Sequence, residues 1–155
     1  MNIERRPSVC QGYGPPAPKA MLPSRGLIIR PPWAEMILSG HKTWEIRGGP
    51  THIRGPIAII AAGSGKILGV CTVTDATGPL TEKTYGLAYR ERGSLHFVPE
   101  SLPYPQTFAW VMASPCRLLQ PVVYEHPKGA VIWVRLSLAT QQSLLAELER
   151  TSSFR

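Results

Sequence analysis

The chain has 155 residues, of which 43% are hydrophobic and 17% charged. This length and composition are typical of one globular domain and exclude a wholly disordered chain. No run of about 18 apolar residues is present, so the sequence predicts no helix that crosses a membrane. The formal net charge is +7, and residues 1–66 hold nine of the 17 basic residues but only three of the ten acidic ones. Such a one-sided basic balance favours phosphate-bearing partners, although a protein that is merely basic has the same composition.

The N-terminal third of the chain predicts a tail, a strand and a helix. Residues 1–24 are polar and rich in Pro and Gly, which is typical of a flexible tail. Residues 26–30 form a short apolar run of strand type, which two prolines end. Apolar residues at helical spacing over 33–37 predict a helix that stops at Gly40. The start of this helix would offer N–H groups to an anion.

The remaining elements are mostly short strands separated by turn residues. Strands are predicted at 43–47, 56–62, 67–74, 107–112, 118–124 and 130–137. A short helix is predicted from Thr81 to about Arg92, and a terminal helix over 140–150. Short strands with one early crossover helix favour an α+β fold, namely a small closed β-barrel beside an early helix, a middle helix and a C-terminal helix. A doubly wound sheet is not favoured, because helices and strands do not alternate regularly.

The cysteines and acidic residues bear on metal binding and on the cellular compartment. Cys10, Cys71 and Cys116 are widely spaced and form no CxxC pair. This spacing argues against a disulfide scaffold and a zinc ribbon, and fits a reducing cytosol. With a single aspartate, the chain offers no metal-ligand set. No apolar stretch follows the first arginines, so we expect no secretory signal. Together with the cysteine spacing this favours a cytoplasmic protein, and we expect no cofactor.

The densest group of charged residues lies at 41–47. Strand geometry places Glu45 and Arg47 on one face, with Lys42 at the mouth of the strand. A carboxylate beside a guanidinium forms either a structural ion pair or a donor fork and an acceptor for a nucleotide. The spacing alone leaves both interpretations open.

This cluster resembles the signature of a known family, the ASCH domain of the PUA-like superfamily, and it reads Gly40-x-Lys42-x-x-Glu45-x-Arg47. The resemblance extends over about residues 26–137. It implies a PUA-like barrel with a cleft between the barrel and the early helix. We therefore expect an ASCH domain at 25–138, between a tail at 1–24 and a C-terminal helix and tail at 139–155.

The resemblance also implies RNA or another nucleic acid as partner, with Lys42, Glu45 and Arg47 lining the cleft. The chemistry of the residues agrees, since the two cations can neutralise phosphate and the carboxylate can accept from a base amino group or hold the arginine. Trp33 is either a stacking surface for an unpaired base or a core anchor. Three flanking cations either extend a phosphate track or are simply solvated: Arg30, Arg54 and Lys66. The other three tryptophans are expected in the core: Trp44, Trp110 and Trp133.

Whether the protein is an enzyme stays open in the sequence. Some members of the family resemble amidohydrolases of N4-acetylcytidine with a lysine–threonine–glutamate constellation, and at least one resembles a ribonuclease. The lysine matches Lys42, but Glu45 stands at the threonine position, and the glutamate position falls near Ala88, with Glu91 the closest carboxylate. A ribonuclease would use Lys42 and Glu45 as catalytic groups in the same cleft. RNA cannot be told from DNA by the sequence, and the oligomeric state is not determined by it.

Overall fold

The computed structural model describes residues 22–85 and 102–154. The predicted N-terminal tail and most of the predicted middle helix lie outside these ranges. A helical turn is present at 82–85, where the Thr81 hydroxyl accepts a hydrogen bond from the backbone N–H of Thr84, as expected for a helix cap.

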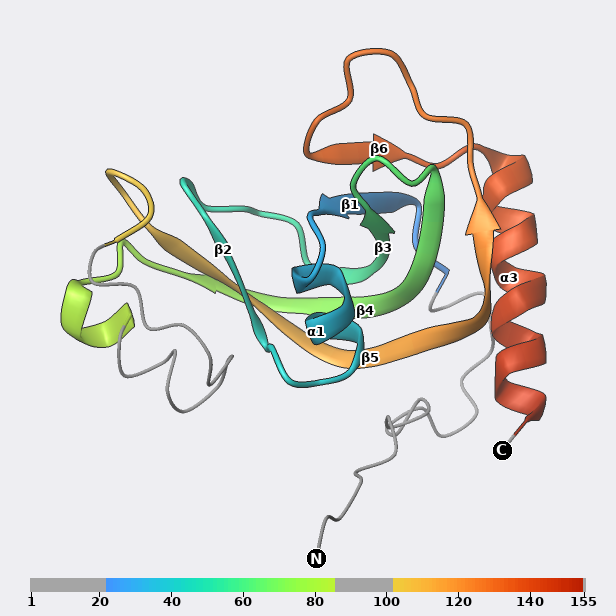
Figure 1. The fold of residues 1–155 in the computed structure, drawn as a ribbon, viewed down its shortest axis with the longest axis horizontal. Helices are drawn as coiled ribbons and strands as arrows, with labels where there is room; N and C mark the ends of the chain where they lie inside the picture. The colour runs from blue at the N-terminus through green and yellow to red at the C-terminus, as the bar shows by residue number, and fades with distance from the viewer. Residues whose placement is uncertain (1–21, 86–101, 155) are drawn as a thin grey trace, which may run out of the picture.

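Six strands and two longer helices make up the described part of the chain (Figure 1). In chain order they are β1 (Arg25–Ile29), α1 (Trp33–Leu38), β2 (Trp44–Arg47), β3 (Gly55–Ala61), β4 (Lys66–Thr77), β5 (Phe108–Val123), β6 (Trp133–Arg135) and α3 (Leu138–Ser153).

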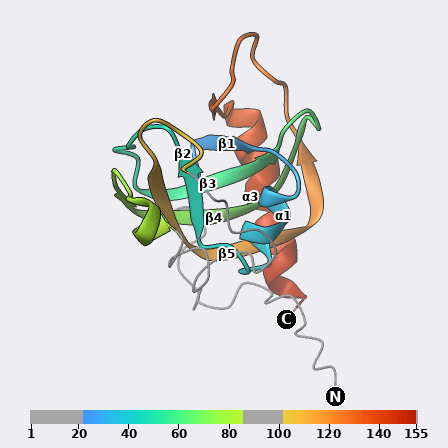
Figure 2. The same cartoon turned by 60° about the vertical axis from the view of Figure 1, so that its left-hand side comes forward.

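The strands form one mixed sheet in the order β2-β5-β4-β3-β1-β6. Only β1 and β3 run parallel, and the other neighbours are antiparallel. The long strands β4 and β5 bend strongly, so that the sheet curls into a half-barrel with β2 on one side of α1 and α3 along the end of β5 (Figures 1 and 2). The predicted α+β class and the barrel-like sheet are confirmed, but the described strands form a half-barrel and not the closed barrel that was expected, since β2 and β6 are not paired with each other.

The strand β5 differs from the prediction of two separate strands at 107–112 and 118–124. It runs unbroken through a bulge, because β5 advances from Ala113 to Cys116 while β4 advances only from Thr72 to Val70. Ser114, whose φ is 49°, takes up the additional length. The proline that follows suggested a strand end, but proline is tolerated at a bulge, where no ladder hydrogen bond is required of it.

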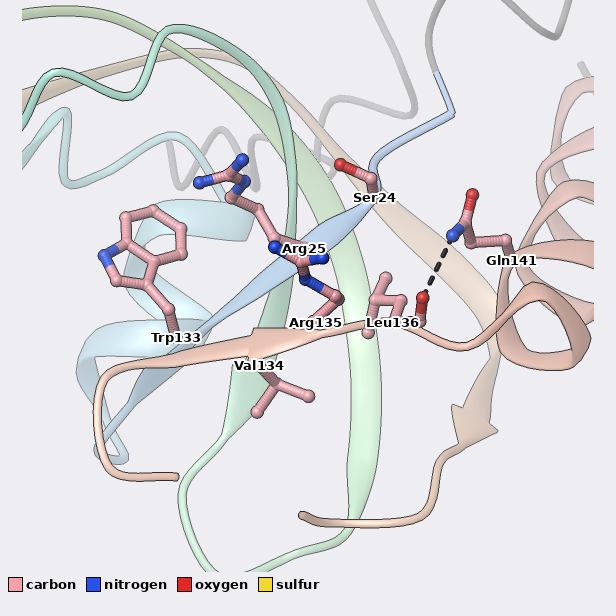
Figure 3. A pocket seen from close by; sticks show the side chains of 7 residues that line it. All are labelled: Ser24, Arg25, Trp133, Val134, Arg135, Leu136 and Gln141. Atoms are coloured by element: carbon pink, nitrogen blue, oxygen red, sulfur yellow. Dashed lines mark hydrogen bonds between the residues drawn. The ribbon is translucent and has the colours of Figure 1, made fainter. Parts of the chain in front are cut away.

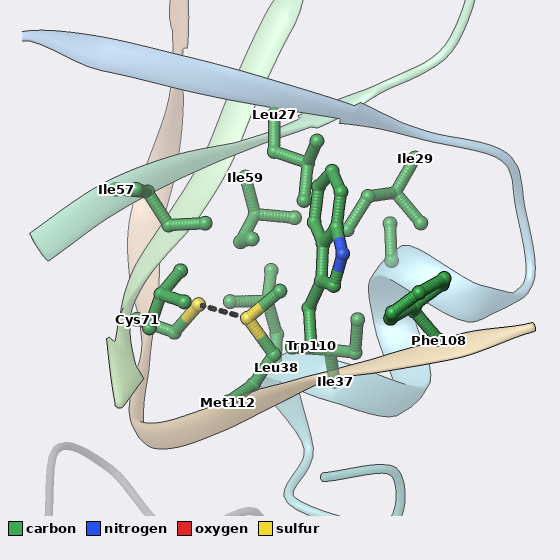
Figure 4. Close-up of a cluster of buried hydrophobic side chains, with 12 residues drawn as sticks. Leu27, Ile29, Ile37, Leu38, Ile57, Ile59, Cys71, Phe108, Trp110 and Met112 are labelled. Atoms are coloured by element: carbon green, nitrogen blue, oxygen red, sulfur yellow. Dashed lines mark hydrogen bonds between the residues drawn. The ribbon is translucent and has the colours of Figure 1, made fainter. Parts of the chain in front are cut away.

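The two faces of the sheet support separate groups of buried side chains. One group lies between the sheet and α1 and includes Trp110 and Cys71 (Figure 4). The other lies under α3 and includes Leu144 and Cys116. Both cysteines are buried as expected. Cys116 takes part in a disulfide, which the cysteine spacing did not predict.

The helix α1 approaches the sheet closely at Gly69 of β4. A Cβ atom at this position would lie 2.6 Å from Leu38 Cδ2 and even nearer to the backbone carbonyl oxygen of Cys116. The absence of a side chain therefore sets the distance between α1 and the sheet. This distance matters for the site, because α1 leads directly into the charged segment before β2.

Replacing Gly69 by alanine should lower the free energy of unfolding by about 1–3 kcal/mol, since backbone and helix must both shift to admit the methyl group. Urea denaturation measures this change. Gly49→Ala is the matched control, because nothing lies within 4 Å of a Cβ there. Equal stability of the two variants would show that α1 does not pack as closely as described.

Candidate functional site

The charged cluster is carried by β2, an edge strand that pairs only with β5 in the described sheet. Its alternation is as predicted, but the inward side is the charged one. Glu45 is buried, with 6% of its surface exposed, whereas Trp44 is partly exposed. The prediction that Trp44 belongs to the core is therefore wrong. Period two fixes which side chains share a face, and it does not say which face is covered.

Three charged side chains meet at the carboxylate of Glu45. Lys42 Nζ donates to one carboxylate oxygen at 2.8 Å, and Arg47 Nε donates to the other at 3.1 Å. Arg47 Nη2 also donates to the backbone carbonyl oxygen of Ile28 at 2.9 Å. Because Ile28 belongs to β1 on the far side of the sheet order, this hydrogen bond ties the edge strand β2 across the barrel to β1.

Burial differs within this triad of Lys42, Glu45 and Arg47. The side chains of Lys42 and Glu45 are each 8% exposed, and that of Arg47 is 19% exposed. The predicted convergence of the three residues is present. The expected open groove does not extend to Lys42 and Glu45, which are covered and already bonded to each other. Only the guanidinium of Arg47 keeps appreciable access to solvent.

Aromatic rings surround the triad. Lys42 Nζ lies 5.2 Å from the ring centroid of Trp33, and the guanidinium carbon of Arg47 lies 5.6 Å from that of Trp110. These are cation–π distances, and the partial loss of water around both cations strengthens such contacts. Trp110 in turn stacks on Trp133, with centroids 5.8 Å apart and planes 11° from parallel. A column of stacked groups therefore runs from Arg47 through Trp110 to Trp133.

Sequence reasoning assigned Trp110 and Trp133 to the core, and both do pack in the cluster beside α1. It missed that they connect the charged cluster to the opposite edge of the sheet. The signal for this connection is weak in the sequence, because β5 and β6 are not neighbours in the sheet and meet only when it curls.

The three cations that flank the triad in the sequence, namely Arg30, Arg54 and Lys66, lie in different parts of the fold. The guanidinium of Arg54 donates to the backbone carbonyls of Thr51 and Ile53 and lies 3.7 Å from the carboxylate of Asp75, so it supports the loop before β3. Lys66 begins β4, ten residues before Ala76, which is the residue of β4 level with the triad. Lys66 is exposed, and no hydrogen bond or ion pair joins its side chain to the triad in the described part of the chain.

Arg30 is exposed and directly precedes the turn into α1, close to the triad in the chain. Its backbone carbonyl accepts hydrogen bonds from the N–H groups of Trp33 and Ala34, at 2.9 and 3.4 Å. The expectation that the start of this helix offers N–H groups to an anion is therefore wrong for these two residues, since their donors are already used.

Catalytic alternatives find limited support in the geometry. Both oxygens of Glu45 accept hydrogen bonds from cations, which leaves the carboxylate poorly placed to take a proton from a substrate. Ala88 and Glu91 lie outside the described residues.

Within residues 22–85 and 102–154, no group of three or more His, Cys, Asp or Glu side chains could hold a metal ion. In the same ranges no helix is long and apolar enough to span a bilayer.

The buried thiol of Cys71 lies behind the triad, in contact with Met112 at 3.7 Å between the sulfur atoms. Burial, and to a smaller extent the negative charge of Glu45, raise the pKa of Cys71 from 9.0 to about 12. The thiol therefore stays protonated and unreactive at neutral pH.

Exchanging the carboxylate of Glu45 for an amide of the same shape should cost about 3–5 kcal/mol of unfolding free energy, because two cations then face each other in a covered site. Thermal or urea unfolding measures the loss. Asp75→Asn is the matched control, since its ion pair with Arg54 is exposed and should contribute less than about 1 kcal/mol. A change in Glu45→Gln as small as in the control would contradict a carboxylate that holds both cations.

The raised pKa of Cys71 makes stability depend on pH in the alkaline range. Above pH 9 the unfolded chain releases the thiol proton and the folded chain keeps it, so the free energy of unfolding should fall as the pH rises from 9 towards 12. Cys71→Ser, compared with the parent by urea unfolding at several pH values, should lack this part of the decline. A parallel decline in both proteins would exclude the assignment to Cys71.

Comparisons with known proteins bear on the family and the fold of the chain. The family model of the ASCH domain matches residues 27–122. The crystal structure of ASCH from Zymomonas mobilis has a TM-score of 0.59 at 16% identity, covering 79% of this chain and 93% of that one. A serine-to-alanine mutant of that protein has a TM-score of 0.59 at 17% identity, covering 82% and 97%. A tyrosine-to-phenylalanine mutant has 0.58 at 17%, covering 79% and 96%.

No curated protein matches the chain. The solved structures, at these identities, establish the shared fold. The family match spans β1 to β5 and includes all three residues of the triad. Because it covers more than half of the sequence, the chain belongs to the ASCH domain family.

Proposed function

We propose that this protein is a nucleic-acid-binding module that takes single-stranded RNA at the face presented by Arg47. The observation that carries the proposal is the unbalanced charge of the triad, in which one carboxylate serves two cations. Proteins of the ASCH family are generally RNA-binding or hydrolase-like, which sets the range of activities to consider. The contacts of the triad favour binding within that range.

Arg47 is the group best placed to meet a phosphate. Its Nε and Nη2 are held by Glu45 and by the carbonyl oxygen of Ile28, while its Nη1 makes no hydrogen bond within the described part of the chain. A guanidinium fixed in this way loses little entropy when a ligand binds. Its 19% exposure leaves room for an anion to approach. Glu45 and Lys42 thus act as positioning residues.

The surroundings of the triad suit an unpaired nucleotide. Trp33 is partly exposed and carries Lys42 near its ring, so it offers an aromatic surface beside positive charge. Bases of single-stranded RNA are commonly held by such stacking. Arg30, exposed just before α1, supplies a further cation for the backbone.

The competing function is an RNA-directed hydrolase, either a ribonuclease or a modified-cytidine amidohydrolase, that uses Lys42 and Glu45 as catalytic groups. It has less support, because a general base must accept a proton and Glu45 accepts two charged hydrogen bonds already. The two functions separate cleanly in one assay. Incubation with total RNA and with N4-acetylcytidine, with and without a chelator, should give no turnover. Turnover that disappears in Glu45→Gln, at a temperature where circular dichroism shows this destabilised variant to be folded, would support the hydrolase instead.

Replacing Arg47 by glutamine should weaken binding of a fluorescein-labelled ten-nucleotide oligouridine by roughly tenfold at low salt, since a phosphate contact to a fixed guanidinium is lost. Fluorescence anisotropy measures the affinity, and circular dichroism confirms that the variant is folded.

The control for this change is Arg150→Gln, which removes an arginine that is also paired with a glutamate, Glu147, but on the last turn of α3. Its affinity should stay within about twofold of the parent, as for a charge outside the interface. Equal affinities of folded Arg47→Gln and of the parent would overturn the proposed interface.

A further inference from the structure

A second basic site lies at the other end of the aromatic column. A pocket of about 550 Å³ opens beside β1, β6 and the start of α3 (Figure 3). Trp133 lines it, and so do two arginines, Arg25 and Arg135. In Figure 3 these three side chains point to one side of β6, while Val134 points to the other.

The two arginines stand directly opposite each other on neighbouring antiparallel strands, since Arg25 of β1 pairs with Arg135 of β6. Both are exposed, and neither makes an ion pair in the described part of the chain. Like charges at directly opposite positions destabilise a sheet, and an acidic neighbour normally offsets that cost. In the described part of the chain no carboxylate offsets the repulsion between Arg25 and Arg135. An anion held between the two guanidinium groups would offset it.

Further polar groups converge on the same pocket. The hydroxyl of Ser24 is exposed at its rim. The side-chain amide of Gln141 is held at the pocket by donating to the carbonyl oxygen of Leu136 at 3.0 Å (Figure 3). The pocket also adjoins the first turn of α3, a helix of 16 residues whose dipole adds positive potential there. All of these features favour an anion of phosphate size with several acceptor oxygens.

The aromatic column connects this pocket to the triad. Trp133 contacts the pocket and stacks on Trp110, which in turn lies under the guanidinium of Arg47. The two basic sites therefore lie at the two ends of one row of stacked groups. A single extended ligand with regularly spaced negative charges could contact both.

We propose that Arg25 and Arg135 form a phosphate-binding subsite, in which the two guanidinium groups hold a nucleotide phosphate and Trp133 contacts the attached sugar and base. This inference rests on the proposed function where the ligand is RNA. In that case Arg47 contacts one phosphate of the strand, and the subsite holds a second one. The same chemistry would also admit a free mononucleotide, and the experiment distinguishes the two sources.

The test uses the full chain and the double variant Arg25→Gln with Arg135→Gln. Isothermal titration calorimetry with uridine 5′-monophosphate and with inorganic phosphate, run on the parent, the double variant and Arg47→Gln, separates binding at the pocket from binding at Arg47. Anisotropy with the ten-nucleotide oligouridine measures the polymer. The double variant should bind each probe at least about tenfold more weakly, because two charge-assisted contacts to one phosphate are lost. Its salt dependence with the oligouridine should also be shallower by about one unit of slope.

Lys83→Gln with Lys128→Gln is the charge-matched control, because both lysines are exposed and lie outside the pocket. It removes the same net charge and should change affinity by less than about threefold. The melting temperature supplies a second readout. Relief of the like-charge pair should raise the melting temperature of the free double variant above that of the free parent, so that weaker binding cannot be attributed to unfolding.

The outcomes separate the subsite from the proposed function. If the parent binds oligouridine and the double variant binds all probes equally well, the subsite is excluded while RNA binding stands. If the parent binds uridine 5′-monophosphate through the two arginines but does not bind oligouridine, the subsite is upheld as a mononucleotide site and the proposed function fails. If the charge-matched control weakens binding as much as the double variant, the effect is that of net charge and the subsite is excluded.

Discussion

A carboxylate that is removed from water needs cations beside it, and this protein meets that need with one residue from before β2 and one from within it. Glu45 accepts from Lys42 and from Arg47, and Arg47 reaches on to the backbone of Ile28 in β1. The desolvation of these charges is costly, so the pairs must be closely fitted to be retained. The consequence is mechanical as well as electrostatic. The edge strand β2, the turn after α1 and the far strand β1 are held together through one carboxylate.

The same contacts explain why the core and the candidate interface share residues. Trp110 is buried at 5% exposure, yet it lies beneath the guanidinium of Arg47 and against Trp133. A partly exposed arginine that rests on a buried ring is pre-organised, because neither the ring nor the hydrogen-bonded guanidinium is free to reorient. The interior of the barrel thereby fixes the position of a surface charge. The proposed phosphate subsite at the opposite edge of the sheet is built in a similar way, since its arginines lie beside Trp133, which stacks on Trp110.

Much of this arrangement could be predicted from the sequence. Strand spacing places Glu45 and Arg47 on one face, and the resemblance to the ASCH signature groups Lys42 with them. The strand and turn pattern favours a barrel. Two features could not be read in the same way. Period two does not reveal which face of an edge strand is covered, so the sequence left open whether Glu45 is buried in a structural ion pair or faces a ligand. The pairing of Arg25 with Arg135 joins residues about 110 positions apart, and neither residue carries a local signal of its partner.

The central claim is that a nucleic-acid ligand meets the arginines at the two ends of the aromatic column. The most direct measurement is the NMR spectrum of the arginine Nε–H groups, recorded on the folded protein during titration with an unlabelled ten-nucleotide oligouridine. The account predicts that the resonances of Arg47, Arg25 and Arg135 shift together and saturate at one affinity, while that of Arg150 stays in place. The account would be contradicted if the resonances of Arg47, Arg25 and Arg135 stay in place while those of other arginines shift.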